Sequence, residues 1–134
     1  MLEQINSRLD TLSSSLQLRS ARQQVLASNI ANVDTPGYVA RDIDFGAALQ
    51  NAMAGQKGLN LGHSDARHLV VTSTEGLIGS PLAYTVQTQP SLDGNSVDLD
   101  QQRANFTDNS IRYESTLRFI NGHVKTMLSA ITGQ

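Results

Sequence analysis

Apolar residues recur at steps of three and four near the N-terminus, a spacing that places them on one face of an α-helix. The pattern is interrupted where Arg19 and Gln23 occupy the projected positions, and it resumes at Leu26. We therefore predict a helix over about residues 3–33. Its predicted helix-pairing positions are Leu9, Leu12, Leu16, Leu26 and Ile30.

A second stripe of the same kind runs through the last third of the chain. Asp98 and Gln101 have the spacing of a capping box at a helix start. The stripe is interrupted only near Arg103 and Ser110, and the helix is expected over about residues 98–132, nearly to Gly133. Its predicted helix-pairing positions are Phe106, Tyr113, Leu117, Ile120, Val124 and Met127.

Both stripes are narrow, as in a coiled coil, and each covers the other if the two helices pair. The predicted fold is therefore mainly α, with the terminal helices paired as an antiparallel coiled-coil hairpin within a single domain over residues 1–134. An irregular middle segment, about 34–96, separates them. It is expected to hold a short helix over 45–54, with Asp44 as its N-cap and Gly55 as its stop, and short strands over 67–72 and 82–87.

Turn chemistry marks the end of the first long helix. Thr35 precedes a proline and is therefore pushed towards an extended conformation, while Pro36 has a fixed φ and Gly37 tolerates a positive φ. Asn32 or Asp34 can end the helix, since Asn is the best non-glycine residue for a left-handed C-cap. The sequence thus predicts a sharp stop followed by a tight turn.

The composition is poor in bulky core residues. The 134 residues are 39% hydrophobic and only 4% aromatic, with no Trp. Because aromatic side chains dominate core burial, this shortage indicates an elongated shape or burial completed by other chains. An isolated hairpin of this kind is expected to be marginally stable and to become rigid when neighbouring chains pack on it.

Charge and cysteine content narrow the function classes. A net charge of −2 with a pI near 5.8 argues against nucleic-acid binding, which needs a basic face. The absence of cysteine removes disulfides, thiolate catalysis and Cys-based zinc sites. The N-terminus lacks the apolar run of a signal peptide, and no segment approaches a membrane span.

No catalytic constellation stands out, so we expect neither an enzyme nor a cofactor. Asp42 and Asp44 form a DxD pattern, but nothing nearby supplies the further oxygens that a metal needs. His63 and His68 are five apart rather than four, and the third histidine is His123. Ser73 and Ser80 lack the context of a hydrolase nucleophile.

Residues 27–38, Ala-Ser-Asn-Ile-Ala-Asn-Val-Asp-Thr-Pro-Gly-Tyr, resemble the N-terminal signature of bacterial flagellar rod and hook proteins. Residues 40–45 are similar to the proximal-rod members, and residues 94–100 are similar to the turn that opens their C-terminal helix. Gln102 stands where the family usually has Glu, and Val39 where it often has Lys.

The resemblance implies a structural subunit of the proximal rod in the flagellar basal body. Such a protein is exported unfolded through the flagellar type III apparatus without a cleaved signal. It assembles helically in the periplasmic rod with its own copies and other rod proteins, above the export gate or basal-body ring. The resulting tube transmits torque and conducts exported subunits.

The residues expected to contact neighbouring subunits lie in and after the signature. They are Asn29, Asn32, Thr35, Pro36, Gly37, Tyr38, Asp42 and Phe45. Two alternatives stay open for Asn29 and Asn32. Either Asn32 caps the C-terminus of the helix and Asn29 is exposed, or both amides bridge to neighbouring subunits or hold the following loop. Tyr38 either anchors the loop on the helices or contacts a neighbour.

The rival hypothesis is a self-associating helical adaptor or a secretion chaperone. It explains two helices with apolar stripes. It leaves the specified turn at residues 34–38 unexplained.

Overall fold

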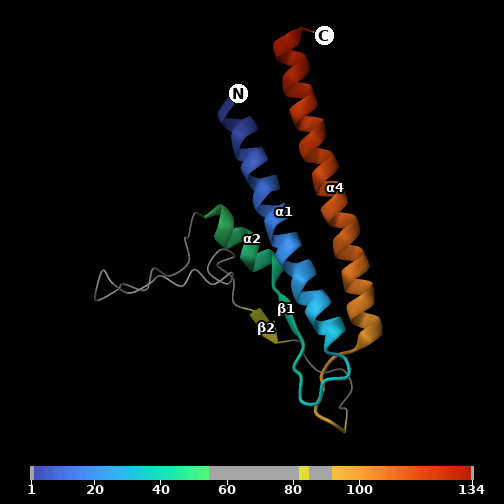
Figure 1. Ribbon diagram of the computed structural model, residues 1–134. Coiled ribbons are helices and arrows are strands. Elements are labelled where there is room, and N and C mark those ends of the chain that lie inside the picture. The colour runs from blue at the N-terminus through green and yellow to red at the C-terminus, as the bar shows by residue number, and fades with distance from the viewer. Residues whose placement is uncertain (1, 55–81, 85–91, 134) are drawn as a thin grey trace, which may run out of the picture.

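Two long helices dominate the computed structural model, which describes residues 2–54, 82–84 and 92–133. In chain order the elements are α1 (Leu2–Ala31), β1 (Arg41–Ile43), α2 (Phe45–Met53), β2 (Leu82–Tyr84) and α4 (Leu99–Thr132). α1 and α4 lie side by side, and both chain termini are at the same end of the pair (Figure 1). The protein is therefore mainly helical, with its first and last helices as neighbours.

α1 is covered on two sides. α4 runs along one side, and β1 with α2 lies on the other (Figure 1). Leu18 and Ala21 of α1 form a small core with Ile43 and Ala48, against which three half-buried side chains pack. These are Val25, Phe45 and Leu49. The single stripe predicted for the N-terminal helix was therefore incomplete, because Leu18, Ala21 and Val25 make a second apolar face.

The predicted N-caps are confirmed. Asp44 accepts a hydrogen bond from the backbone N–H of Ala47 at the start of α2, and Asp98 accepts one from Gln101 at the start of α4. Each bond satisfies a backbone donor that the first helical turn leaves free. The side-chain amide of Gln101 turns forward to Asn105 instead of back to the cap residue. α4 ends at Gly133, whose φ of 73° is left-handed.

A two-stranded antiparallel sheet joins distant parts of the chain. Arg41 pairs with Tyr84 and Ile43 with Leu82. The predicted strand over 82–87 appears as β2 over 82–84, and its partner β1 was not expected from the sequence. The strand predicted over 67–72, and Gly55, lie outside the described residues.

Buried side chains are concentrated near the loops. We call residues 18–54 and 92–116 the loop end, and residues 2–17 and 117–132 the terminal end. All fully buried residues in the described part of the chain belong to the loop end. Large apolar side chains are exposed at both ends: Val39, Met53, Leu92 and Ile111 at the loop end, and Phe119, Val124, Leu128 and Ile131 at the terminal end, which has no buried residue to set against them in the described part of the chain. The two ends of one helix pair therefore differ sharply in packing.

Candidate functional site

The turn after α1 is tight and has a specific backbone geometry. The N–H of Asn32 bonds to the carbonyl of Ser28, and the N–H of Thr35 bonds to the carbonyl of Asn32. Gly37 has φ 69°, which confirms the predicted positive φ. No non-glycine residue in the described segments has a positive φ, so the left-handed cap suggested for Asn32 or Asp34 is wrong. The Asn32 side chain instead donates to the carbonyl of Ser28.

Asn95, from the loop before α4, holds this turn from the other side. Its amide nitrogen lies 3.0 Å from the carbonyl oxygen of Asn32, 2.7 Å from that of Val33 and 2.9 Å from that of Thr35. These carbonyls belong to the turn that follows α1, and those of Asn32 and Thr35 also accept backbone bonds, from Thr35 and Tyr38. Asn95 is only 5% exposed, so water does not replace these bonds easily.

Backbone bonds extend the contact between the two loops. The N–H of Gly37 donates to the carbonyl of Asp93 at 2.9 Å, and the N–H of Ser96 donates to the carbonyl of Tyr38 at 3.0 Å. The Ser96 hydroxyl in turn accepts from the N–H of Ala40 at 2.7 Å. The entry to α4 thus fixes the exit from α1.

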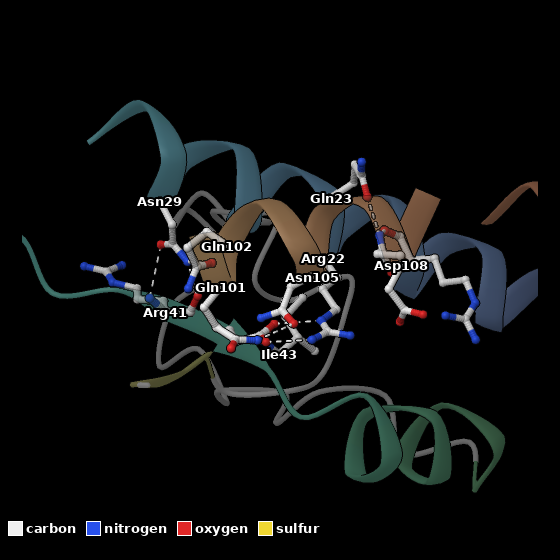
Figure 2. Close-up of polar contacts among 12 residues, drawn as sticks. Arg22, Gln23, Asn29, Arg41, Ile43, Gln101, Gln102, Asn105 and Asp108 are labelled. Carbon is white, nitrogen blue, oxygen red and sulfur yellow. Dashed lines mark hydrogen bonds and ion pairs between the residues drawn. The ribbon is translucent and has the colours of Figure 1, made fainter. Parts of the chain in front are cut away.

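Asn29 is the central polar residue of the loop end (Figure 2). Its amide nitrogen donates to the carbonyl of Arg41 at 2.6 Å, and its amide oxygen accepts from the N–H of Arg41 at 3.2 Å. The same nitrogen donates to Oε1 of Gln102 on α4 at 3.0 Å. The Tyr38 hydroxyl also donates to its oxygen. One side chain therefore joins α1, the strand entry and α4.

An ion pair between Arg22 and Asp42 fastens β1 to α1. Nε and Nη2 of the guanidinium each donate to one carboxylate oxygen at 2.8 Å, a bidentate geometry. The hydrogen bond to Asp42 raises the pKa of Arg22 above its ordinary value. In the described segments, no three acidic or histidine side chains group together as metal ligands would.

Arg19 lies over the ring of Phe45, with 4.4 Å between the guanidinium carbon and the ring centroid. This cation–π contact adds to the apolar packing of α2 on α1. Burial lowers the pKa of Arg19, and repulsion from Arg112 and Arg22 lowers it further. Phe45 is thus used within the subunit.

A polar layer lies between α1 and α4 where both apolar stripes are interrupted. The Gln23 amide donates to the hydroxyl of Ser110 at 2.7 Å, and Gln23 Oε1 accepts from the Asn109 amide. The Asn109 amide also donates to the carbonyl of Arg19 at 2.9 Å. The interruptions at Arg19 and Gln23 on one helix therefore match the interruption at Ser110 on the other.

The predicted contact residues divide into an inner and an outer group. Asn29 is 0% exposed, so the alternative in which it is exposed is wrong, and its side chain has no surface left for a neighbouring subunit. It holds the following loop through the backbone of Arg41. The members whose side chains are engaged or packed within the chain are Asn29, Asn32, Tyr38, Asp42 and Phe45. Thr35, Pro36 and Gly37 are exposed on the turn, where the Thr35 hydroxyl also donates to Oδ1 of Asn32 at 3.1 Å.

The predicted helix-pairing positions are only partly buried. Leu26 is fully buried, whereas Val124 is 51% exposed. The remaining positions are half-buried: Leu9, Leu12, Leu16, Ile30, Phe106, Tyr113, Leu117, Ile120 and Met127. The fully buried residues of α4 are polar, namely Gln102, Asn109 and Thr116.

The sequence did not show that five residues make these buried or loop-fixing contacts. They are Arg22, Asn95, Ser96, Gln102 and Asn109. A signal existed for two of them. Gln102 and Asn109 are seven residues apart, one heptad, directly beside the apolar stripe. Asn95 and Ser96 lay in the recognised turn but gave no indication of which groups they bind.

This architecture defines a class, a mainly helical protein whose first and last helices are neighbours and whose buried polar residues serve its own loop and helix contacts. The model of the "Flagella basal body rod protein" family matches residues 9–38. "Flagellar basal body rod protein FlgB" of Proteus mirabilis strain HI4320 and that of Yersinia enterocolitica are each 42% identical over 98% of both chains. FlgB of Escherichia coli K12 is 41% identical over 98% of this chain and 97% of its own.

The chain therefore belongs to the flagellar basal body rod protein family. Its members are structural subunits of the basal body and not enzymes. None of the described helices combines the length and hydropathy needed to span a membrane.

Proposed function

We propose that this chain builds the proximal rod of the flagellum by helical assembly with its own copies and other rod proteins. The assembled tube transmits torque and conducts exported subunits, and its base meets the export gate or a basal-body ring. Within it α1 and α4 pair as an antiparallel coiled coil along their whole length. The observation that supports the proposal is that four large apolar side chains of α4 are more than half exposed at the terminal end, where the described residues do not cover them.

The physical argument is one of incomplete burial. Each large apolar side chain that becomes buried contributes roughly 1.5–3 kcal/mol. Phe119, Leu128 and Ile131 are 64%, 60% and 81% exposed, so most of this stabilisation is available only from neighbouring chains. A subunit with this distribution is only weakly ordered alone and rigid once assembled.

The exposed turn supplies a second contact surface. Thr35, Pro36 and Gly37 project from the loop end, while Asn95 and Asn29 fix the backbone behind them. A rigid turn lowers the entropy lost on binding, which favours its use as a contact. We propose that this turn touches the next subunit along the rod.

Co-purification tests the proposed location. A tagged copy should replace the resident protein in a flagellated strain lacking it, restore motility, and remain with basal bodies after detergent extraction. A helical adaptor or secretion chaperone would stay in the cytosolic fraction. That result would overturn the proposal.

Two variants of Gly37 test the turn. Gly37→Val should prevent rod assembly and motility, because a β-branched residue is strained by roughly 1–2 kcal/mol or more at positive φ. In the described segments, no atom other than those of Gly37 and its two chain neighbours lies within 4 Å of an added Cβ there, so strain and not a clash is the expected cause. Gly37→Asn is the matched control, since Asn tolerates this conformation, and it should retain assembly. Equal motility of the two variants at equal protein levels would contradict the assigned role.

A further inference from the structure

The fully buried residues of α4 form a regular polar series. Gln102, Asn109 and Thr116 follow one another at intervals of seven and are 3%, 0% and 7% exposed. Residues one heptad apart occupy the same face of a paired helix, a face that is ordinarily apolar. The most buried positions of this helix are therefore occupied by polar residues.

Two of these residues meet amides of α1. Gln102 lies beside Asn29 and accepts from its amide (Figure 2). Asn109 donates to Gln23 and to the carbonyl of Arg19. Thr116 bonds within its own helix, to the carbonyl of Arg112. We call Asn29, Gln102, Gln23 and Asn109 the amide pairs.

The amide pairs are not an arrangement for maximum stability. In the described residues, Oδ1 of Asn109 and Nε of Arg19 are buried without a hydrogen-bond partner. An unsatisfied buried polar atom is destabilising. Apolar side chains at the two facing positions of a pair, such as Gln23 and Asn109, would avoid that cost. In known coiled coils, a polar residue buried between the helices specifies how the two helices are aligned.

Sliding one helix past the other breaks the amide pairs. If α4 moves by one heptad so that Asn109 faces Asn29, Gln102 passes the end of α1 at Ala31 and has no amide partner on that helix, and Gln23 faces the Thr116 hydroxyl in place of an amide. If it moves the other way, Gln102 faces Gln23, and Asn29 has no amide partner on α4. The half-buried leucines elsewhere on α1 could pack about equally well in each alignment, because an apolar repeat looks the same after one heptad.

We propose that the amide pairs are the positioning residues that select a single alignment of α4 on its own α1. In either shifted alignment, at least one of these amides is left without an amide partner. The same happens when either helix pairs with the apolar stripe of another copy. The apolar stripe supplies attraction without alignment. The amide pairs supply alignment with little attraction.

The test compares disulfide formation in alternative alignments, which the cysteine-free chain makes possible. Extending the pairing of Gln23 with Asn109 by two heptads places Leu9 opposite His123. Leu9→Cys is therefore combined with His123→Cys for the native alignment, and with Thr116→Cys or Ala130→Cys for the two shifted ones. The effective concentration of each pair is measured by exchange with glutathione in the purified full chain.

The series is repeated in the double variant Gln23→Leu/Asn109→Leu. The control is Gln24→Leu/Asn121→Leu, which makes the same chemical changes at exposed positions of the same helices. We expect the native pair to exceed the shifted pairs by about tenfold or more in the parent and the control. In the Gln23/Asn109 variant this ratio should fall towards one, or disulfide-linked dimers should appear.

Helix content from circular dichroism should stay equal or rise in the Gln23/Asn109 variant, because both amides are replaced together. A parent chain that shows no preference for the native pair would overturn the proposal. A Gln23/Asn109 variant that keeps the parental ratio and stays monomeric would overturn it as well.

Discussion

The loop end and the terminal end are built from the same two helices but are held together differently. At the loop end, Asn29, Asn95 and the Arg22–Asp42 pair connect four segments, and a small core lies between α1 and α2. At the terminal end, the described side chains are at best half-buried, and four large apolar residues of α4 are more than half exposed. The buried contacts of the described chain are therefore concentrated at the loop end, although Met53, Leu92 and Ile111 are exposed there as well.

The difference shows where each kind of interaction is useful. Hydrogen bonds and ion pairs depend on direction, so they fix a turn that must present one geometry. Apolar contact is not directional and grows with the area buried, so it suits a surface that several neighbouring helices cover. A rod subunit needs both properties in one chain.

Hydrogen exchange should show the largest contrast between the two ends. Backbone amides of α1 near Leu26 should be protected about a hundredfold more than those near Leu9 in the purified chain, because local opening is cheapest where few apolar contacts are lost. The measurement is exchange followed by mass spectrometry. Equal protection along α1 would show that the terminal end is ordered without neighbours.

Truncation of matched leucines should sharpen the same contrast. Leu26→Ala should lower the free energy of unfolding by about 3 kcal/mol, since its side chain is fully buried. Leu9→Ala should cost about 1 kcal/mol, since Leu9 is only half-buried. Urea titration followed by circular dichroism measures both. If Leu9→Ala proved the costlier change, the assignment of the two ends would be reversed.

Asn95 tests the loop-to-loop contact. Asn95→Ala should cost roughly 2 kcal/mol, because three carbonyls of the α1 exit lose a buried donor. Asn95→Asp should cost at least as much, since a carboxylate cannot donate to them. The readout is the thermal melting of the purified chain. An Asp variant as stable as the parent would show that donation by Asn95 is unimportant.

The smallest expected effect belongs to the ion pairs. Arg22→Gln should cost about 1 kcal/mol, because Arg22 and Asp42 are only 20% and 19% exposed and their contact is bidentate. Arg112→Gln removes a pair that is 60% and 54% exposed, and it should change stability by less than about 0.5 kcal/mol. The urea midpoint of each variant gives the comparison. Equal midpoints would show that the Arg22–Asp42 pair stabilises the fold no more than the exposed Arg112–Asp108 pair does.

Local features of the chain were predictable from the sequence because neighbouring residues decide them. The apolar period placed both long helices, with the observed α1 over 2–31 and α4 over 99–132 against predictions of 3–33 and 98–132. The caps at Asp44 and Asp98 and the positive φ at Gly37 followed from side-chain and backbone chemistry within a few residues. The signature at residues 27–38 identified the family.

The partners of the polar side chains were decided only by the tertiary structure. Asn29 meets Gln102 across 73 residues, and Asn95 meets Val33 across 62. A sequence shows that an amide has donors and acceptors, but not which distant backbone comes to satisfy them. For this reason the sequence determined the helices and the turn of this protein. Only the packing of α1 between α4 and β1 determined which signature residues face inward and which remain on the surface.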